Sequence, residues 1–60
     1  MRERIIKLRH RLEWSQARMA KELGVSQPTI WRIEHGRQEP SKSVLKLLEI
    51  FEARLKELTI

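Results

Sequence analysis

Two serines and two glycines divide the first two-thirds of this chain into short segments. Ser15 precedes a helix-favouring run that reaches Gly24, and Ser26 precedes a second run that reaches Gly36. A serine hydroxyl accepts a hydrogen bond from a free amide at the start of a helix, and glycine readily adopts the left-handed conformation that commonly ends one. The pattern therefore predicts two short helices separated by a tight turn at Gly24.

Apolar residues at helical spacing extend this prediction to both ends of the chain. Ile5, Leu8 and Leu12 recur at intervals of three and four with charged residues between them, which is typical of an amphipathic helix. After Pro40, no glycine or proline interrupts the sequence, and no strand pattern is present anywhere. We expect an all-α, compact bundle of four to five helices in a single domain (1–60), with helices at about 2–12, 16–23, 27–35 and 41–59. The last of these is either one long helix or two short ones.

The charge of the chain points to a polyanionic partner. Lys and Arg number 13 against eight Glu, which gives a formal net charge of +5. Most of the excess lies in residues 1–40, with nine basic and five acidic residues. Nucleic acid is one partner that such a surface fits. The alternatives are a charge that only keeps the domain soluble, or a basic peptide on a membrane surface, which the helix caps disfavour.

The sequence lacks the motifs that catalysis or metal binding would need. No nucleophile–base signature, glycine-rich phosphate loop or metal-ligand spacing is present, and His10 and His35 alone do not predict a metal site. No apolar run approaches the ~20 residues of a membrane span. We expect a soluble cytoplasmic protein that is not an enzyme, with no cofactor, metal, small-molecule ligand or membrane contact implied.

The two short helices around Gly24 match the arrangement in which one helix braces another across a DNA backbone. Ala20 is small where the first helix must approach the second closely. Apolar residues lie where the two helices would share a core, at Met19, Leu23, Val25, Ile30 and Ile33. A central helix-turn-helix is therefore expected within the bundle.

The segment SQARMAKELGVSQPTIWRIEHGR, residues 15–37, resembles the Cro/C1-type (XRE-like) helix-turn-helix domain, and the similarity extends over roughly residues 5–50. The resemblance implies a lambda-repressor-like bundle that binds double-stranded operator DNA, usually as a homodimer, and commonly represses transcription. It also implies association with the nucleoid when the protein is bound. The segment 40–48 is similar to small antitoxin-type members of the family, which implies a toxin as a possible protein partner.

The resemblance also implies an ion pair between Arg9 in the first helix and Glu34 at the end of the third. We interpret both residues as structural. A buried pair would make the loss of one partner cost about 3–5 kcal/mol. The alternative is a solvated pair worth less than about 1 kcal/mol.

The outward face of the third helix carries the residues predicted to read bases, which are Gln27, Pro28, Trp31 and Arg32. Gln27 can pair with adenine N6 and N7, and Arg32 with guanine O6 and N7. Pro28 departs from the family, which often has a hydrogen-bonding side chain here, and it offers only an apolar contact such as one with a thymine methyl. Trp31 either makes a similar contact or packs on neighbouring side chains. His35 is interpreted as a polar residue at the helix end.

Phosphate contacts are expected from helix N-termini and from short polar or basic side chains. The predicted residues form two groups. One is Ser15 and Gln16 at the start of the second helix, and the other is Thr29, Arg37, Ser41, Lys42 and Ser43. For Arg11, Arg18 and Lys21, a solvated charge is the preferred interpretation.

The last helix has more apolar residues than one stripe can bury. We expect its first part to close the core, and the remaining apolar surface to meet a second copy of the chain. The candidate dimer residues are Leu45, Ile50, Phe51, Leu55 and Leu58. The alternative is that a small core uses all of them. The rival function is an antitoxin-type interaction module whose main partner is a protein, with DNA binding secondary.

Overall fold

A computed structural model describes residues 2–58, and its regular structure within that range is entirely α-helical. Its elements are α1 (Arg2–Leu12), α2 (Gln16–Leu23), α3 (Gln27–Glu34) and α4 (Lys42–Leu58). The predicted all-α class is confirmed for the described residues. α4 is one continuous helix, which decides between the two alternatives for the last segment. Its expected end at Thr59 lies outside the described residues.

The predicted caps define the ends of the middle helices. Ser15 Oγ accepts a hydrogen bond from the Arg18 amide at 3.1 Å, and Ser26 Oγ accepts one from the Thr29 amide at 3.3 Å. Gly24 ends α2 in the left-handed conformation, with φ 72°. α3 ends at Glu34, one residue earlier than expected, because the cap position is taken by His35 and followed by left-handed Gly36.

The turn between α1 and α2 has no glycine, although its backbone requires a left-handed residue. Glu13 takes that conformation with φ 58°. The amides of Glu13 and Trp14 donate to the carbonyl oxygens of His10 and Arg9, both at 3.1 Å, and so close the end of α1. The strain of a non-glycine residue there is offset by these hydrogen bonds.

All four helices contribute to a single apolar core. α1 supplies Ile5 and Leu8, and α4 supplies Val44 and Leu48. The rest of the buried set comes from α2 and α3, namely Met19, Ala20, Leu23, Ile30 and Ile33. Full burial of each large apolar side chain contributes about 1.5–3 kcal/mol. The core therefore holds α3 in place along its inner side and leaves its outer side to solvent.

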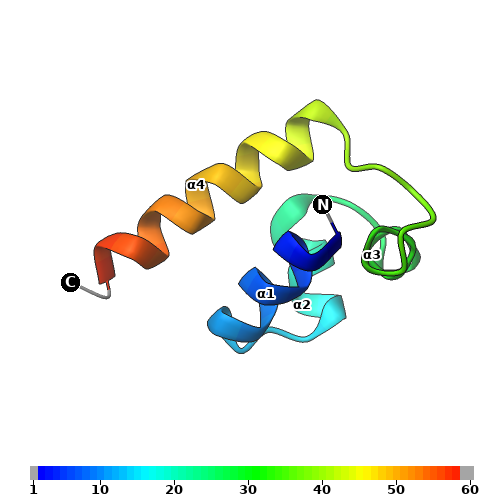
Figure 1. The fold of residues 1–60 in the computed structure, drawn as a ribbon. Coiled ribbons are helices and arrows are strands. Elements are labelled where there is room, and N and C mark those ends of the chain that lie inside the picture. Colours follow the sequence, from blue (N-terminus) through cyan, green and yellow to red (C-terminus); the bar gives the residue numbers. More distant parts are fainter. Residues whose placement is uncertain (1, 59–60) are drawn as a thin grey trace.

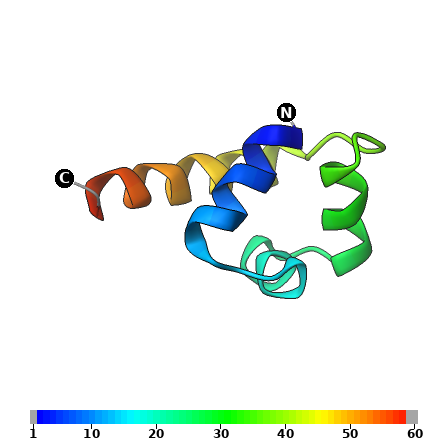
Figure 2. The ribbon, with the colours of Figure 1, turned by 60° about the horizontal axis from the view of Figure 1, so that its bottom comes forward.

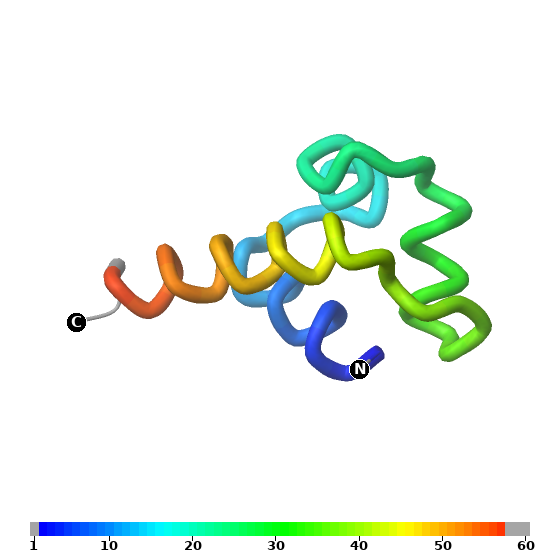
Figure 3. The backbone as a smooth tube through the Cα atoms, turned by 90° about the horizontal axis from the view of Figure 1, so that it is seen from above, coloured from blue at the N-terminus to red at the C-terminus, as the bar shows by residue number. Residues whose placement is uncertain are grey.

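The second half of α4 extends away from α3, beyond the bundle formed by α1, α2 and the first turns of α4 (Figure 1, Figure 2 and Figure 3). Leu55 on this half of α4 packs against the core, and polar and aromatic contacts also hold the half-helix to the bundle. Arg4 on α1 donates to Glu52 at 2.9 and 2.6 Å, and the rings of Trp14 and Phe51 meet edge to face with centroids 5.4 Å apart. Within residues 2–58, no helix combines the length and apolar character needed to cross a bilayer.

Candidate nucleic-acid interface

The outer face of α3 brings together the four side chains predicted to read bases. Gln27, Pro28, Trp31 and Arg32 are all exposed. They line one open hollow of about 510 Å³, and Gln16 at the start of α2 completes its wall. The spacings of Gln27 to Trp31 and of Pro28 to Arg32 are four residues, which places each pair on one helix face. The structure therefore presents these side chains as one surface.

Trp31 is exposed yet held in place. The side chain is 43% exposed. Its ring stacks on the His35 imidazole, with centroids 3.9 Å apart and the planes inclined by 19°. His35 Nδ1 lies 2.8 Å from the Trp31 carbonyl oxygen, to which it donates, and the Arg37 guanidinium lies 5.9 Å from the indole centroid. The indole thus both packs on neighbours and lines the hollow, so the two interpretations of Trp31 are compatible.

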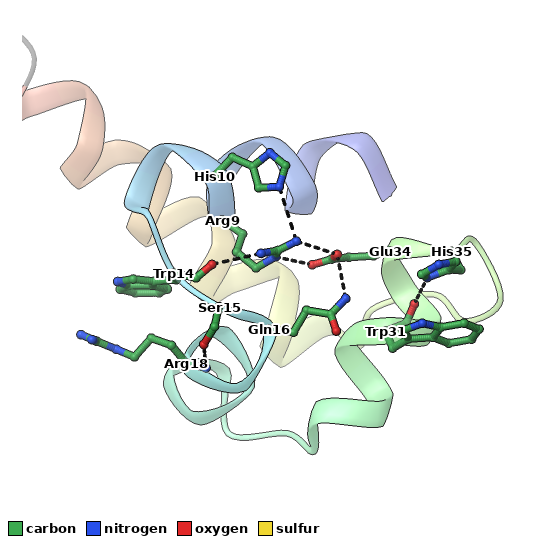
Figure 4. Close-up of polar contacts among 9 residues, drawn as sticks. All are labelled: Arg9, His10, Trp14, Ser15, Gln16, Arg18, Trp31, Glu34 and His35. Atoms are coloured by element: carbon green, nitrogen blue, oxygen red, sulfur yellow. Dashed lines mark hydrogen bonds and ion pairs between the residues drawn. The ribbon is translucent and has the colours of Figure 1, made fainter.

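A buried ion pair fixes α3 against α1. The Arg9 guanidinium donates to both oxygens of Glu34, at 2.7 and 3.1 Å, and a third bond runs to the Trp14 carbonyl at 3.0 Å. The side chains of Arg9 and Glu34 are 16% and 5% exposed, so Glu34 is buried and the Arg9 guanidinium is largely shielded from solvent. Figure 4 shows these groups converging between the helices, behind the outer face of α3.

Gln16 joins this network from α2. Its amide Nε2 donates to Glu34 Oε1 at 3.1 Å, so one carboxylate connects three helices. Because the same side chain lines the hollow on α3, it connects that hollow to the Arg9–Glu34 pair. No local pattern in the sequence predicts this bond, since it depends on the angle between α2 and α3.

The residues predicted to contact phosphate lie in different settings. Ser15 and Gln16 are together at the start of α2, where the first backbone amides of a helix have no partner within it. Thr29 is half-buried, and its hydroxyl is 2.8 Å from that of Ser26, so it serves the cap of α3. Thr29 lies in the first turn of α3, whereas Arg37 of the same expected group follows the other end of that helix.

The start of α4 provides the remaining candidates. Ser41 Oγ accepts a hydrogen bond from the Val44 amide at 3.3 Å and so caps the helix. Lys42 and Ser43 are exposed in its first turn. Among the charges interpreted as solvated, Arg18 pairs with Glu22 at 2.8 Å.

The candidate dimer residues are unequally exposed. Ile50 is 42% exposed on α4. Leu45, Phe51 and Leu55 are half-buried, since they pack against the core of their own chain. The side chain of Leu58 lies outside the described residues.

The comparison with known families decides what this arrangement is. The family model described as a helix-turn-helix domain matches residues 2–57. The chain belongs to the helix-turn-helix domain family. Nothing among curated proteins or solved structures matches the chain significantly. In a helix-turn-helix domain the second helix of the motif lies in the DNA major groove, and here that helix is α3, preceded by α2 and the turn at Gly24.

Proposed function

We propose that this helix-turn-helix domain is a sequence-specific, double-stranded DNA-binding transcriptional regulator of the Cro/C1 (XRE-like) type. It acts as a dimeric repressor on a palindromic operator. The observation that carries the proposal is the shared hollow on α3, where two hydrogen-bonding and two apolar side chains are exposed together. Behind it, the Arg9–Glu34 pair holds the helix rigidly, as base reading requires.

Each exposed residue of α3 has a role in this scheme. Gln27 pairs with adenine and Arg32 with guanine, each worth about 1–3 kcal/mol of discrimination against the wrong base. Pro28 and Trp31 contribute apolar contacts. Phosphates on one side of the groove are held by Ser15, Gln16 and the free amides of α2. On the other side they are held by Arg37, Ser41, Lys42 and Ser43, with a smaller share for Thr29.

Dimerisation follows from the length of DNA that one helix can read. A single recognition helix contacts only a few base pairs, whereas two copies about 34 Å apart read a palindrome on one face of the duplex. The exposed Ile50 on the protruding part of α4 is the proposed centre of the interface. Leu45, Phe51 and Leu55, which are only half-buried, are the other residues proposed to contribute to the contact.

Selection from a random DNA library tests the proposal even though the operator is unidentified. We expect the purified protein at moderate salt to enrich a palindrome with half-sites about one helical turn apart. Arg32→Ala should relax the preference at one position of each half-site. Arg11→Ala is the matched control, because it removes the same charge from an exposed position on α1 and should leave the motif unchanged. Binding that falls with salt but enriches no sequence would contradict the proposal.

A second candidate function rests on a different surface. An open groove of about 350 Å³ runs between α1 and the second half of α4, with Leu8 and Leu55 among its lining residues. Its other lining residues are Arg4, Lys7, Arg11, Glu52 and Lys56, so basic side chains predominate. Such a groove fits an acidic amphipathic helix, as an antitoxin-type module would need for a toxin partner. Under this alternative, Lys7→Glu would abolish partner binding and leave the DNA motif intact.

A further inference from the structure

The hollow on α3 pairs an apolar notch with an arginine. Pro28, which offers no side-chain hydrogen bond, and Trp31 line the hollow three residues apart on α3, and the space between them is this notch; Arg32 lines the same hollow. Pro28 lies in the first turn of α3, the part of a recognition helix that enters the groove first. The notch and the guanidinium can therefore reach neighbouring base pairs.

Both walls of the notch are restrained by their neighbours, which suits a contact of defined shape. The pyrrolidine ring locks the backbone of Pro28. The Trp31 indole stacks on the imidazole of His35, which follows the C-terminal end of α3, with 3.9 Å between the ring centroids. This stack restrains the indole. A preformed apolar notch loses little conformational entropy when a small apolar group fills it.

On the major-groove edge of an unmodified base pair, one such group is available, the C5-methyl of thymine. A 5-methylcytosine carries its methyl group at the same ring position. The two bases differ at C4, where thymine has an accepting oxygen and cytosine a donating amine. Neither hydrogen-bonding side chain of the hollow is assigned to that C4 group, because Gln27 pairs with an adenine and Arg32 with the guanine, so the contact with the pyrimidine does not distinguish the two bases.

We propose that α3 reads a 5-methylpyrimidine next to a guanine, with the methyl group between Pro28 and Trp31 and the guanine paired to Arg32. Thymine and 5-methylcytosine are then equivalent at that position, and unmethylated cytosine is disfavoured. The inference rests on the proposed function, because it requires α3 to enter the major groove. It makes this domain responsive to cytosine methylation within its own binding site.

Four versions of one duplex test the inference. The duplex is the best sequence from the library selection, and the pyrimidine before the guanine is set to thymine, deoxyuridine, cytosine or 5-methylcytosine, each with its complementary base. We expect thymine and 5-methylcytosine to bind within about twofold of one another. The duplexes with deoxyuridine or cytosine should bind about fourfold more weakly per half-site. This factor is the equivalent of the ~0.8 kcal/mol gained by burying one methyl group.

Protein variants locate the effect in the notch. Pro28→Ala should bring the thymine-to-deoxyuridine ratio close to one, because a wall of the notch is lost. Lys21→Ala, an exposed substitution on α2, should keep the ratio near four. Thermal unfolding of both variants establishes that they are folded.

The outcomes separate this inference from the proposed function. A selected motif that lacks a pyrimidine–guanine step, or equal binding of thymine and deoxyuridine, overturns the inference while sequence-specific binding stands. Equal binding of cytosine and 5-methylcytosine overturns it as well. Failure to enrich any motif overturns the proposed function itself.

Discussion

The carboxylate of Glu34 accepts two hydrogen bonds from the guanidinium of Arg9, at 2.7 and 3.1 Å, and so ties α3 to α1. Glu34 is the one charged or polar residue buried within the described part of the chain, with 7% of its surface exposed. An ion pair in such surroundings costs desolvation energy, and loss of one partner leaves the other charge uncompensated. The position of α3 thus depends on both residues.

Glu34→Gln should therefore destabilise the domain strongly. We expect a loss of about 3–5 kcal/mol, because the Arg9 charge remains buried without its partner. This is a large part of the roughly 5–15 kcal/mol that stabilises a typical domain. Urea unfolding followed by circular dichroism measures the change.

The exposed pair of Arg18 and Glu22 provides the control for this prediction. These residues are four apart on α2, with side chains 54% and 33% exposed. Glu22→Gln should cost less than about 0.5 kcal/mol, because such surface pairs are weak. If Glu22→Gln and Glu34→Gln lowered the free energy of unfolding equally, the burial of the Arg9–Glu34 pair would make no difference to stability.

The pair of Arg4 and Glu52 predicts a dependence of stability on pH. Hydrogen bonds from Arg4 hold the pKa of Glu52 below its ordinary value, and the same bonds raise the pKa of Arg4. A lowered carboxyl pKa contributes stability above the unfolded pKa, near 4.3, and this is lost as pH falls through the folded value. The stability linked to the raised pKa of Arg4 is fully present at neutral and acidic pH and is lost only as pH rises through strongly alkaline values.

Glu52→Gln should consequently be slightly less stable than the natural chain at pH 7 and equal to it well below pH 4. Both side chains are about a third exposed, at 34% and 35%, so the difference at pH 7 should stay under about 1 kcal/mol. Melting temperatures between pH 7 and pH 3 provide the measurement. Glu39→Gln, at an exposed position in the α3–α4 connection, should show no such convergence.

Local signals in the sequence were sufficient for most of the helix limits. Ser15, Gly24 and Ser26 act through hydrogen bonds and backbone conformations that involve only near neighbours. The left-handed Glu13 was not predicted, because glutamate carries no preference for that conformation.

Contacts between distant segments were harder to predict. The bonds from Gln16 to Glu34 and from Arg4 to Glu52 join residues 18 and 48 positions apart, and their formation depends on helix angles. The residues on the outer face of α3 could be predicted, because helical spacing alone separates the apolar side of this helix from its polar side. The use of the Thr29 hydroxyl in its own helix cap was not predicted, since it depends on a hydrogen bond with the Ser26 hydroxyl at 2.8 Å.

Arg37 and Arg32 should differ in how their loss affects DNA binding. Arg37 follows α3 and is exposed, and we assign it to a phosphate. Arg37→Ala should weaken binding by a similar factor on all sequences and reduce the slope of log K against log salt by about 0.9 per half-site. Arg32→Ala should weaken binding mainly to the selected motif. Titrations at several salt concentrations, on selected and random duplexes, distinguish the two; identical behaviour would contradict the assignment.

Ile50→Glu should dissociate the proposed dimer and leave the fold intact. The side chain is 42% exposed, so a carboxylate there meets water in the single chain, whereas in an interface it would be buried against a second copy. Gln38→Glu, which adds the same charge at an exposed position outside α4, is the control. Sedimentation should show the natural chain and the control as dimers and Ile50→Glu as a monomer with an unchanged melting profile at low concentration.

On DNA, the Ile50→Glu variant should lose its preference for the full palindrome over a single half-site, because the two recognition helices are no longer linked. A monomeric natural chain that still prefers the palindrome would place the contact between copies on the DNA itself and not on α4.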